Sequence, residues 1–142
     1  MQDLEERARQ HVARQGALAH LGAELAEVEA GGAVSLALPF RAEVAQHFGY
    51  FHGGVVATML DNACGCAALL GVPPEQDVVS AEFKLNFLAP ARGGRLVARG
   101  WIVRAGRTLI VCQGSASVGG AEVAIMQATM VAVRARRPGP PG

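Results

Sequence analysis

A long apolar segment runs from Val55 to Leu70. Alanine, leucine and methionine are frequent in it and no proline interrupts it, so the pattern predicts a helix. Its apolar side chains cover most of the helix circumference, which indicates a helix that is buried on nearly all sides. The exceptions are Thr58, Asp61, Asn62 and Gly65, whose three- and four-residue spacings place them in one narrow polar strip.

On both sides of this helix the pattern has the two-residue period of β-strands. The period is clearest from Val79 to Phe87, where apolar and polar residues alternate as in a half-buried strand. The last four predicted strands are separated by three tight turns, which predicts an antiparallel meander. Strands are predicted at 25–29, 34–38, 79–87, 95–104, 107–118 and 122–133, and an amphipathic helix at 3–15.

A helix that is apolar all round cannot be buried against a flat sheet. We therefore expect an α+β fold in which a curved antiparallel sheet wraps around one long central helix. The free edges of such a sheet favour pairing with a second copy of the chain. The expected organisation is an N-terminal helix within 1–20, one domain over 21–133 and a disordered tail at 134–142.

Composition and charge narrow the class of protein. The 142 residues suit a single domain, and a net charge of +1 without a basic stripe counts against nucleic acid as a partner. An N-terminus without an apolar leader argues against a secretory signal, and Asp61 inside the long apolar segment argues against a membrane span. Three cysteines without a disulfide or metal spacing indicate free thiols, so we expect a cytoplasmic protein.

The polar strip holds the first candidate for chemistry. A buried ionised carboxylate is costly unless it is paired or hydrated, so Asp61 is a candidate base. His52-Gly53-Gly54 precedes the helix, where open backbone N–H groups and the helix dipole suit a polarised carbonyl. The alternatives are a structurally paired Asp61 and a packed loop histidine at 52. A metal site of His47, His52 and Asp61 is a further alternative, but no additional ligand at helical spacing supports it.

With these elements in this order, the sequence resembles the hotdog-fold acyl-CoA thioesterases, specifically the phenylacetic acid degradation (PaaI-type) group. The resemblance covers about residues 21–133. It rests on His52-Gly53-Gly54 with Asp61 eight residues after the first glycine, and on Phe87-Leu88-Ala89-Pro90 at the end of a strand. The turn RAGRTL at 104–109 looks like the next hairpin of that family.

The resemblance implies hydrolysis of an aryl- or acyl-CoA thioester to the free acid and CoA, without a metal or a resident cofactor. Gly53 would polarise the thioester carbonyl through its backbone N–H, with His52 shaping the site. Asp61 would act as the general base for water or as the nucleophile. In such relatives the carboxylate and the oxyanion donor come from different subunits, which implies a dimer or tetramer with the site at the interface.

The resemblance also assigns more peripheral residues. Ser80 would orient the attacking water, and Gln46 stands where several relatives have asparagine. Arg104 and Arg107 are candidate contacts for the CoA phosphates, the alternative being solvated turn charges. Two other functions remain open: a hotdog hydratase or dehydratase, which needs a catalytic loop histidine, and a non-catalytic acyl-CoA-binding protein.

Overall fold

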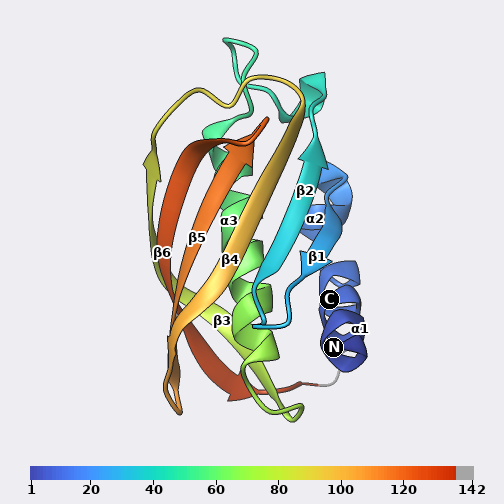
Figure 1. Cartoon of the computed structure of the whole chain (residues 1–142), viewed down its shortest axis with the longest axis vertical. Coiled ribbons are helices and arrows are strands. Elements are labelled where there is room, and N and C mark those ends of the chain that lie inside the picture. Colours follow the sequence, from blue (N-terminus) through green and yellow to red (C-terminus); the bar gives the residue numbers. More distant parts are fainter. Residues whose placement is uncertain (137–142) are drawn as a thin grey trace.

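Figure 1 shows a computed structural model of the chain, which describes residues 1–136. The sheet order is β1-β2-β4-β5-β6-β3, with every pairing antiparallel. Residues 137–142 of the predicted disordered tail lie outside the described residues, and Arg134 ends the last strand. The elements are α1 (Gln2–Ala13), α2 (Gly16–Leu21), β1 (Glu24–Val28), β2 (Val34–Pro39), the 3₁₀ helix η1 (Ala42–Val44), α3 (Gly53–Leu70), β3 (Gln76–Phe87), β4 (Arg95–Ala105), β5 (Leu109–Val118) and β6 (Ala121–Arg134).

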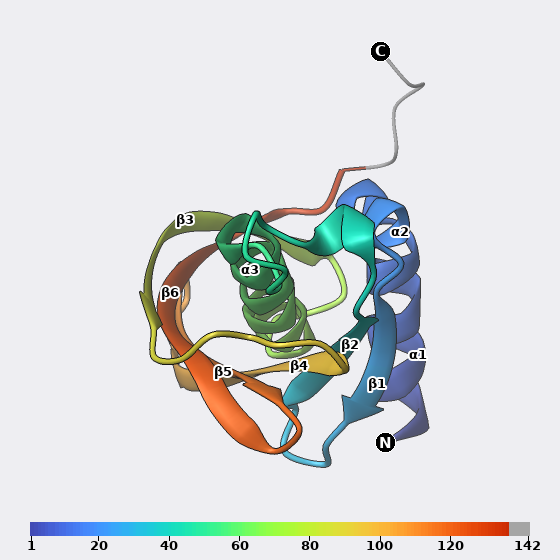
Figure 2. The ribbon, with the colours of Figure 1, turned by 90° about the horizontal axis from the view of Figure 1, so that it is seen from above.

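The long apolar segment forms α3, and the sheet curves around it (Figure 2). Met59, Leu60 and Cys64 are fully buried against the sheet, as the all-round apolar pattern predicts. The α+β fold with a curved sheet around one central helix is therefore confirmed. By length and composition alone α3 would also suffice to cross a membrane, but here it forms the core of the domain.

Two facing glycines let the sheet approach α3 closely. Gly100 on β4 and Gly114 on β5 are paired in register. A Cβ on Gly100 would lie 2.5 Å from backbone atoms of Ala63 and Cys64, and one on Gly114 would lie 3.0 Å from the Cys64 sulfur. Any side chain at Gly100 would push the helix away from the sheet.

The predicted meander is wrong at one connection. The strand β3 pairs with β6 and not with β4, so only β4, β5 and β6 follow one another as neighbours. The segment 88–94 does not form a hairpin turn, because it crosses the loop before α3, where Phe51 N–H donates to Ala91 O. This crossing carries the chain from one side of α3 to the other, where β4 pairs with β2 (Figure 2).

The strand β3 forms one edge of the sheet and is more exposed than its alternating pattern predicts. A bulge between Ser80 and Glu82 reverses the alternation, so Val79 and Phe83 face opposite sides of the sheet. Phe83 and Phe87 lie on the α3 side but remain 43% and 58% exposed. In the single chain β3 is therefore mostly exposed, and the prediction of a half-buried strand is wrong.

The N-terminal helix α1 lies beside α3 and β1 (Figure 1). Ala8 on its inner face is fully buried. The Arg7 guanidinium donates to Val72 O at 2.8 Å and to Pro73 O at 3.2 Å, which fixes α1 against the chain that follows α3.

Candidate active site

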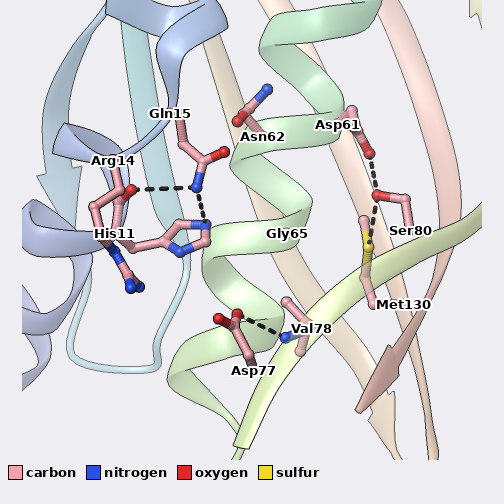
Figure 3. Close-up of a pocket in the computed structure, with 10 residues that line it drawn as sticks. All are labelled: His11, Arg14, Gln15, Asp61, Asn62, Gly65, Asp77, Val78, Ser80 and Met130. Atoms are coloured by element: carbon pink, nitrogen blue, oxygen red, sulfur yellow. Dashed lines mark hydrogen bonds between the residues drawn. The ribbon is translucent and has the colours of Figure 1, made fainter. Parts of the chain in front are cut away.

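Asp61 and Ser80 form a hydrogen-bonded pair between α3 and β3. The Ser80 hydroxyl donates to Asp61 Oδ1 at 2.6 Å and also lies 3.3 Å from the Met130 sulfur (Figure 3). Ser80 is the residue before the β3 bulge and faces the inside of the sheet, as its register partner Met130 does. Within residues 1–136 no lysine or arginine forms an ion pair with Asp61. One carboxylate oxygen, Oδ2, is thus left for another partner.

A cavity of about 310 Å³ opens beside this pair. Most of its wall comes from α3, the beginning of β3, and the end of α1 with the two residues that follow that helix (Figure 3). The lining side chains are mainly polar. They belong to His11, Arg14, Gln15, Asp61, Asn62, Gly65, Asp77, Val78, Ser80 and Met130.

His52 caps the N-terminus of α3. Its Nδ1 accepts a hydrogen bond from the Gly54 N–H at 2.9 Å, and its carbonyl accepts from Val55 and Val56. Nδ1 is therefore the unprotonated ring nitrogen, and the ring is fixed as a cap. Among the described residues the Gly53 N–H has no acceptor, so this donor at the positive end of the helix dipole is open.

A second cavity, of about 400 Å³, lies at this end of α3 and is lined by Gln46, Tyr50, Gly53 and Phe87 among others. The Gln46 side-chain oxygen accepts from the Phe48 N–H at 2.5 Å and from the Tyr50 N–H at 3.3 Å. These bonds commit its oxygen to the loop, and among the described residues its NH₂ group has no acceptor. Phe87 packs over Gly53, since a Cβ on that glycine would lie 3.0 Å from the ring.

One chain does not bring the acid and the open N–H to the same point. Gly53 and Asp61 are eight residues apart on α3, which at 1.5 Å per residue is about 12 Å along the helix axis. They line different cavities, which have no lining residue in common. The structure therefore groups Asp61 with Ser80 and Gly53 with Gln46.

The remaining predicted residues lie elsewhere. Arg104 is exposed near the end of β4, Arg107 is exposed in the following turn, and neither lines one of these two cavities. His47 is exposed beside Phe48, with 4.3 Å between the ring centroids. Over residues 1–136 no three His, Cys, Asp or Glu side chains are grouped for a metal, so His47, His52 and Asp61 do not form the ligand set considered above.

The sequence pattern did not single out His11 on α1, or Arg14 and Gln15 directly after it, which line the Asp61 cavity. His11 and Gln15 are four residues apart in the sequence, and Gln15 Nε2 lies 3.4 Å from His11 Nε2. Burial lowers the pKa of His11, although nearby Asp77 acts in the opposite direction, and its buried Nδ1 has no hydrogen-bond partner among the described residues. No signal in the sequence shows that an ordinary amphipathic helix lies beside the acid.

The three cysteine thiols are buried packing groups and not reactive groups. Cys64, Cys66 and Cys112 are all free and fully buried. Burial raises the pKa of Cys66 to about 12 and that of Cys112 to about 11, and it raises the pKa of Cys64 still further. A protonated, inaccessible thiol is not a nucleophile, which leaves Asp61 as the candidate for chemistry on α3.

Residues 48–125 match the sequence pattern of the thioesterase superfamily. The chain is 34% identical over 93 residues to a protein of Saccharolobus solfataricus named as an esterase, covering 66% of this chain and 65% of that protein. It is 34% identical over 123 residues to a similarly named protein of Halobacterium salinarum, covering 83% and 80%. It is 32% identical over 88 residues to the 1,4-dihydroxy-2-naphthoyl-CoA hydrolase of Listeria monocytogenes, covering 62% and 71%.

Solved structures of other proteins share this fold over most of the chain. A thioesterase family protein from Silicibacter pomeroyi superposes with a TM-score of 0.86 at 38% identity, covering 93% of this chain and 99% of that one. A phenylacetic acid degradation-related protein from Ralstonia eutropha superposes with a TM-score of 0.78 at 22% identity, covering 88% and 98%, which is a likeness of fold.

Proposed function

The chain belongs to the thioesterase superfamily as a hotdog-fold thioester hydrolase, and from this premise we propose that its substrate is an acyl-CoA thioester, which it hydrolyses to a free acid and CoA. The observation that carries the proposal is the Asp61–Ser80 pair, a carboxylate without a cation partner in residues 1–136 that opens on a cavity. The name of the listerial relative, a CoA hydrolase, supports a CoA thioester as the substrate.

In the proposed reaction the Gly53 N–H and the dipole of α3 polarise the thioester carbonyl. Removing an oxyanion donor costs other enzymes about 3 kcal/mol of transition-state stabilisation, which sets the scale of this contribution. Gln46 lines the same cavity, and its NH₂ group is the second candidate donor, because the Gln46 oxygen is already bonded to the loop.

Asp61 supplies the base. Its Oδ1 accepts the Ser80 hydroxyl, so Oδ2 is the atom that takes a proton from water. The water oxygen bonds to the carbonyl carbon, the carbon–sulfur bond breaks, and the CoA thiolate leaves and takes up a proton. In the alternative route Oδ2 attacks the carbonyl carbon itself, and water then hydrolyses the resulting anhydride.

We propose that two copies of the chain complete each site. The distance of about 12 Å along α3 between Gly53 and Asp61 prevents one copy from applying both groups to one carbonyl. The exposed edge of β3, with Phe83 and Phe87 beside it, offers a surface for the second copy. A dimer or a tetramer built on this edge would bring Asp61 of one copy toward Gly53 of the other.

Contacts for the CoA phosphates are also a proposal. Arg104 and Arg107 are exposed and have no ion-pair partner among residues 1–136, as a phosphate contact requires. Arg92 is a third candidate, since its guanidinium lies 4.8 Å from the centroid of the Tyr50 ring at the Gly53 cavity. A soluble CoA ester and three free thiols are consistent with our proposal of a cytoplasmic location.

The test is thiol release from a panel of aryl- and straight-chain acyl-CoAs. We expect Asp61→Asn to abolish release while circular dichroism and size-exclusion profiles remain those of the wild type. Near-normal hydrolysis by this variant would rule out the assignment of Asp61. A hydratase would change enoyl or hydroxyacyl thioesters without releasing thiol, and a binding protein would retain the ester intact, so the same assay separates these alternatives.

A further inference from the structure

The strand β3 is one of the two edges of the sheet, and its free side has no strand partner among residues 1–136. The other edge strand, β1, has five residues and lies beside α1 (Figure 1). The β3 edge has twelve residues and carries Phe83, which is 43% exposed. A long edge strand with exposed apolar side chains is a template for pairing with another chain.

We propose that two copies of the chain pair through their β3 strands, antiparallel and in one register, with Phe83 of each copy directly opposite Phe83 of the partner subunit. The inference rests on the proposed function, because it specifies how the second copy is aligned to complete the same site. Such a pairing has a two-fold axis, which crosses β3 at the residue that faces its own copy.

The position of the axis follows from the two halves of the site. Ser80 on β3 bonds to Asp61, and further along the same strand Phe87 packs over Gly53. A two-fold axis that brings Asp61 of one copy toward Gly53 of the partner subunit must cross β3 midway between these two contacts. Residues 83 and 84 lie at this midpoint.

The pleat of the strand leaves two registers. Residues directly opposite each other in an antiparallel pair point to the same face of the sheet. Phe83 lies on the α3 side, whereas Lys84, the next residue of the regular strand, lies on the outer side. Phe83 therefore cannot stand opposite Lys84. Either Phe83 faces Phe83 of the partner subunit, or Lys84 faces Lys84 of the partner subunit.

The charges of β3 select between these two registers. When Phe83 faces its own copy, Glu82 stands opposite Lys84 of the partner subunit, and by symmetry this pair occurs twice. In the other register two lysines stand opposite each other on the axis. Opposite charges in directly facing positions stabilise a sheet, and like charges destabilise it. Neither Glu82 nor Lys84 has an ion-pair partner within residues 1–136, so both are available for the partner subunit.

The bulge of β3 keeps this register in phase with the site. Ala81 is the extra residue between Ser80 and Glu82, so beyond it Ser80 stands opposite Leu85 of the partner subunit, and both side chains face α3. Two residues further along that strand, Phe87 of the partner subunit packs over its own Gly53. The register therefore brings the Asp61–Ser80 pair of one copy beside the open Gly53 N–H of the partner subunit.

Cysteine cross-linking tests the register. Directly facing residues have Cβ atoms about 5 Å apart, whereas in this register the two copies of Lys84 are diagonal neighbours about 7–8 Å apart. A disulfide needs Cα atoms less than about 7 Å apart, so Phe83→Cys should cross-link roughly tenfold faster than Lys84→Cys under mild oxidation. A non-reducing gel measures the linked dimer. The wild type should remain unlinked, because its three cysteines are buried.

Charge reversal is a second test, which leaves the aromatic pair intact. Glu82→Lys and Lys84→Glu should each raise the dissociation constant of the dimer about tenfold in light scattering, and thiol release at limiting protein concentration should fall in parallel. The double variant Glu82→Lys/Lys84→Glu should restore both, because it recreates the pair of opposite charges. Glu27→Lys is the matched control, because Glu27 is exposed on the other edge strand, β1.

Three results would overturn the inference: cross-linking at 84 as fast as at 83, a double variant that does not restore association, or a wild-type chain that stays monomeric. In each of these cases thiol release that is lost in Asp61→Asn would still support Asp61 as the catalytic acid. Absence of thiol release from every acyl-CoA would instead overturn the proposed function, even if Phe83→Cys cross-linked as expected.

Discussion

The Ser80→Ala variant tests the core of the proposed site with the smallest change. It removes one O–H donor, 2.6 Å from Asp61 Oδ1, and leaves the carboxylate in place. A hydrogen bond to a charged group contributes about 1.5–3 kcal/mol. If this bond orients Asp61 for proton transfer, its loss should lower kcat by roughly 10- to 100-fold, since about 1.36 kcal/mol corresponds to one factor of ten.

The assay is thiol release under saturating and limiting acyl-CoA, which separates kcat from KM. We expect KM to change little, because Ser80 acts on the acid and not on the bulk of the substrate. Since Ser80 is exposed within one chain, solvent screens the contribution of this hydrogen bond to stability, and the variant should unfold within a few degrees of the wild-type temperature. Ser115→Ala is the matched control, because its hydroxyl donates to Glu122 at 2.7 Å and neither residue lines the two cavities of the site. A kcat within twofold of the wild type in Ser80→Ala would refute the role of Ser80 in orienting Asp61.

Three further outcomes are expected. His52→Ala removes the α3 cap and should lower the free energy of unfolding by about 1 kcal/mol, and His52→Asn should restore the lost stability. Urea denaturation measures this change, and an unchanged midpoint in His52→Ala would contradict the prediction. Because burial lowers the pKa of His11, the unfolded chain binds the extra proton more tightly, so stability should fall as the pH drops below about 6.5. His11→Leu should flatten this part of the plot of unfolding free energy against pH, and an unaltered slope would contradict the prediction. Phe83→Asp should weaken self-association in light scattering and reduce thiol release in parallel, whereas an active monomer would remove the need for a shared site.

The fold was largely predictable because its central element has an uncommon pattern. A helix that is apolar all round leaves few arrangements besides a sheet that curves around it, and α3 is enclosed in this way. The pairing of β3 was not predictable, since Pro90 and Gly93-Gly94 have the composition of a hairpin turn. A tertiary contact decides the pairing: the segment 88–94 forms a backbone hydrogen bond with Phe51, which is far away in the sequence, in the loop before α3.

The candidate site likewise has residues that the sequence predicts and residues that it does not. Asp61 and Gly53 stand out in the sequence, because a carboxylate within an apolar helix and glycines at its start are uncommon. The inward direction of Ser80 depends on a bulge at the next residue, which no turn signal announces. Arg14 and Gln15 are ordinary polar residues that directly follow an amphipathic helix, and only the packing of α1 beside α3 brings them to the acid's cavity.

The polar strip of α3 explains why the acid and the cavity occur together. Two of its polar side chains are satisfied within the helix, because Thr58 donates to Gly54 O at 2.9 Å and Asn62 donates to Thr58 O at 2.8 Å. Asp61 has its partner on another element, Ser80, and Gly65 leaves open space. The strip lies where the sheet does not enclose the helix, between the edge strand β3 and α1 (Figure 2). The open side of the sheet thus leaves Asp61 partly exposed beside a cavity, although most of α3 is enclosed in the apolar core.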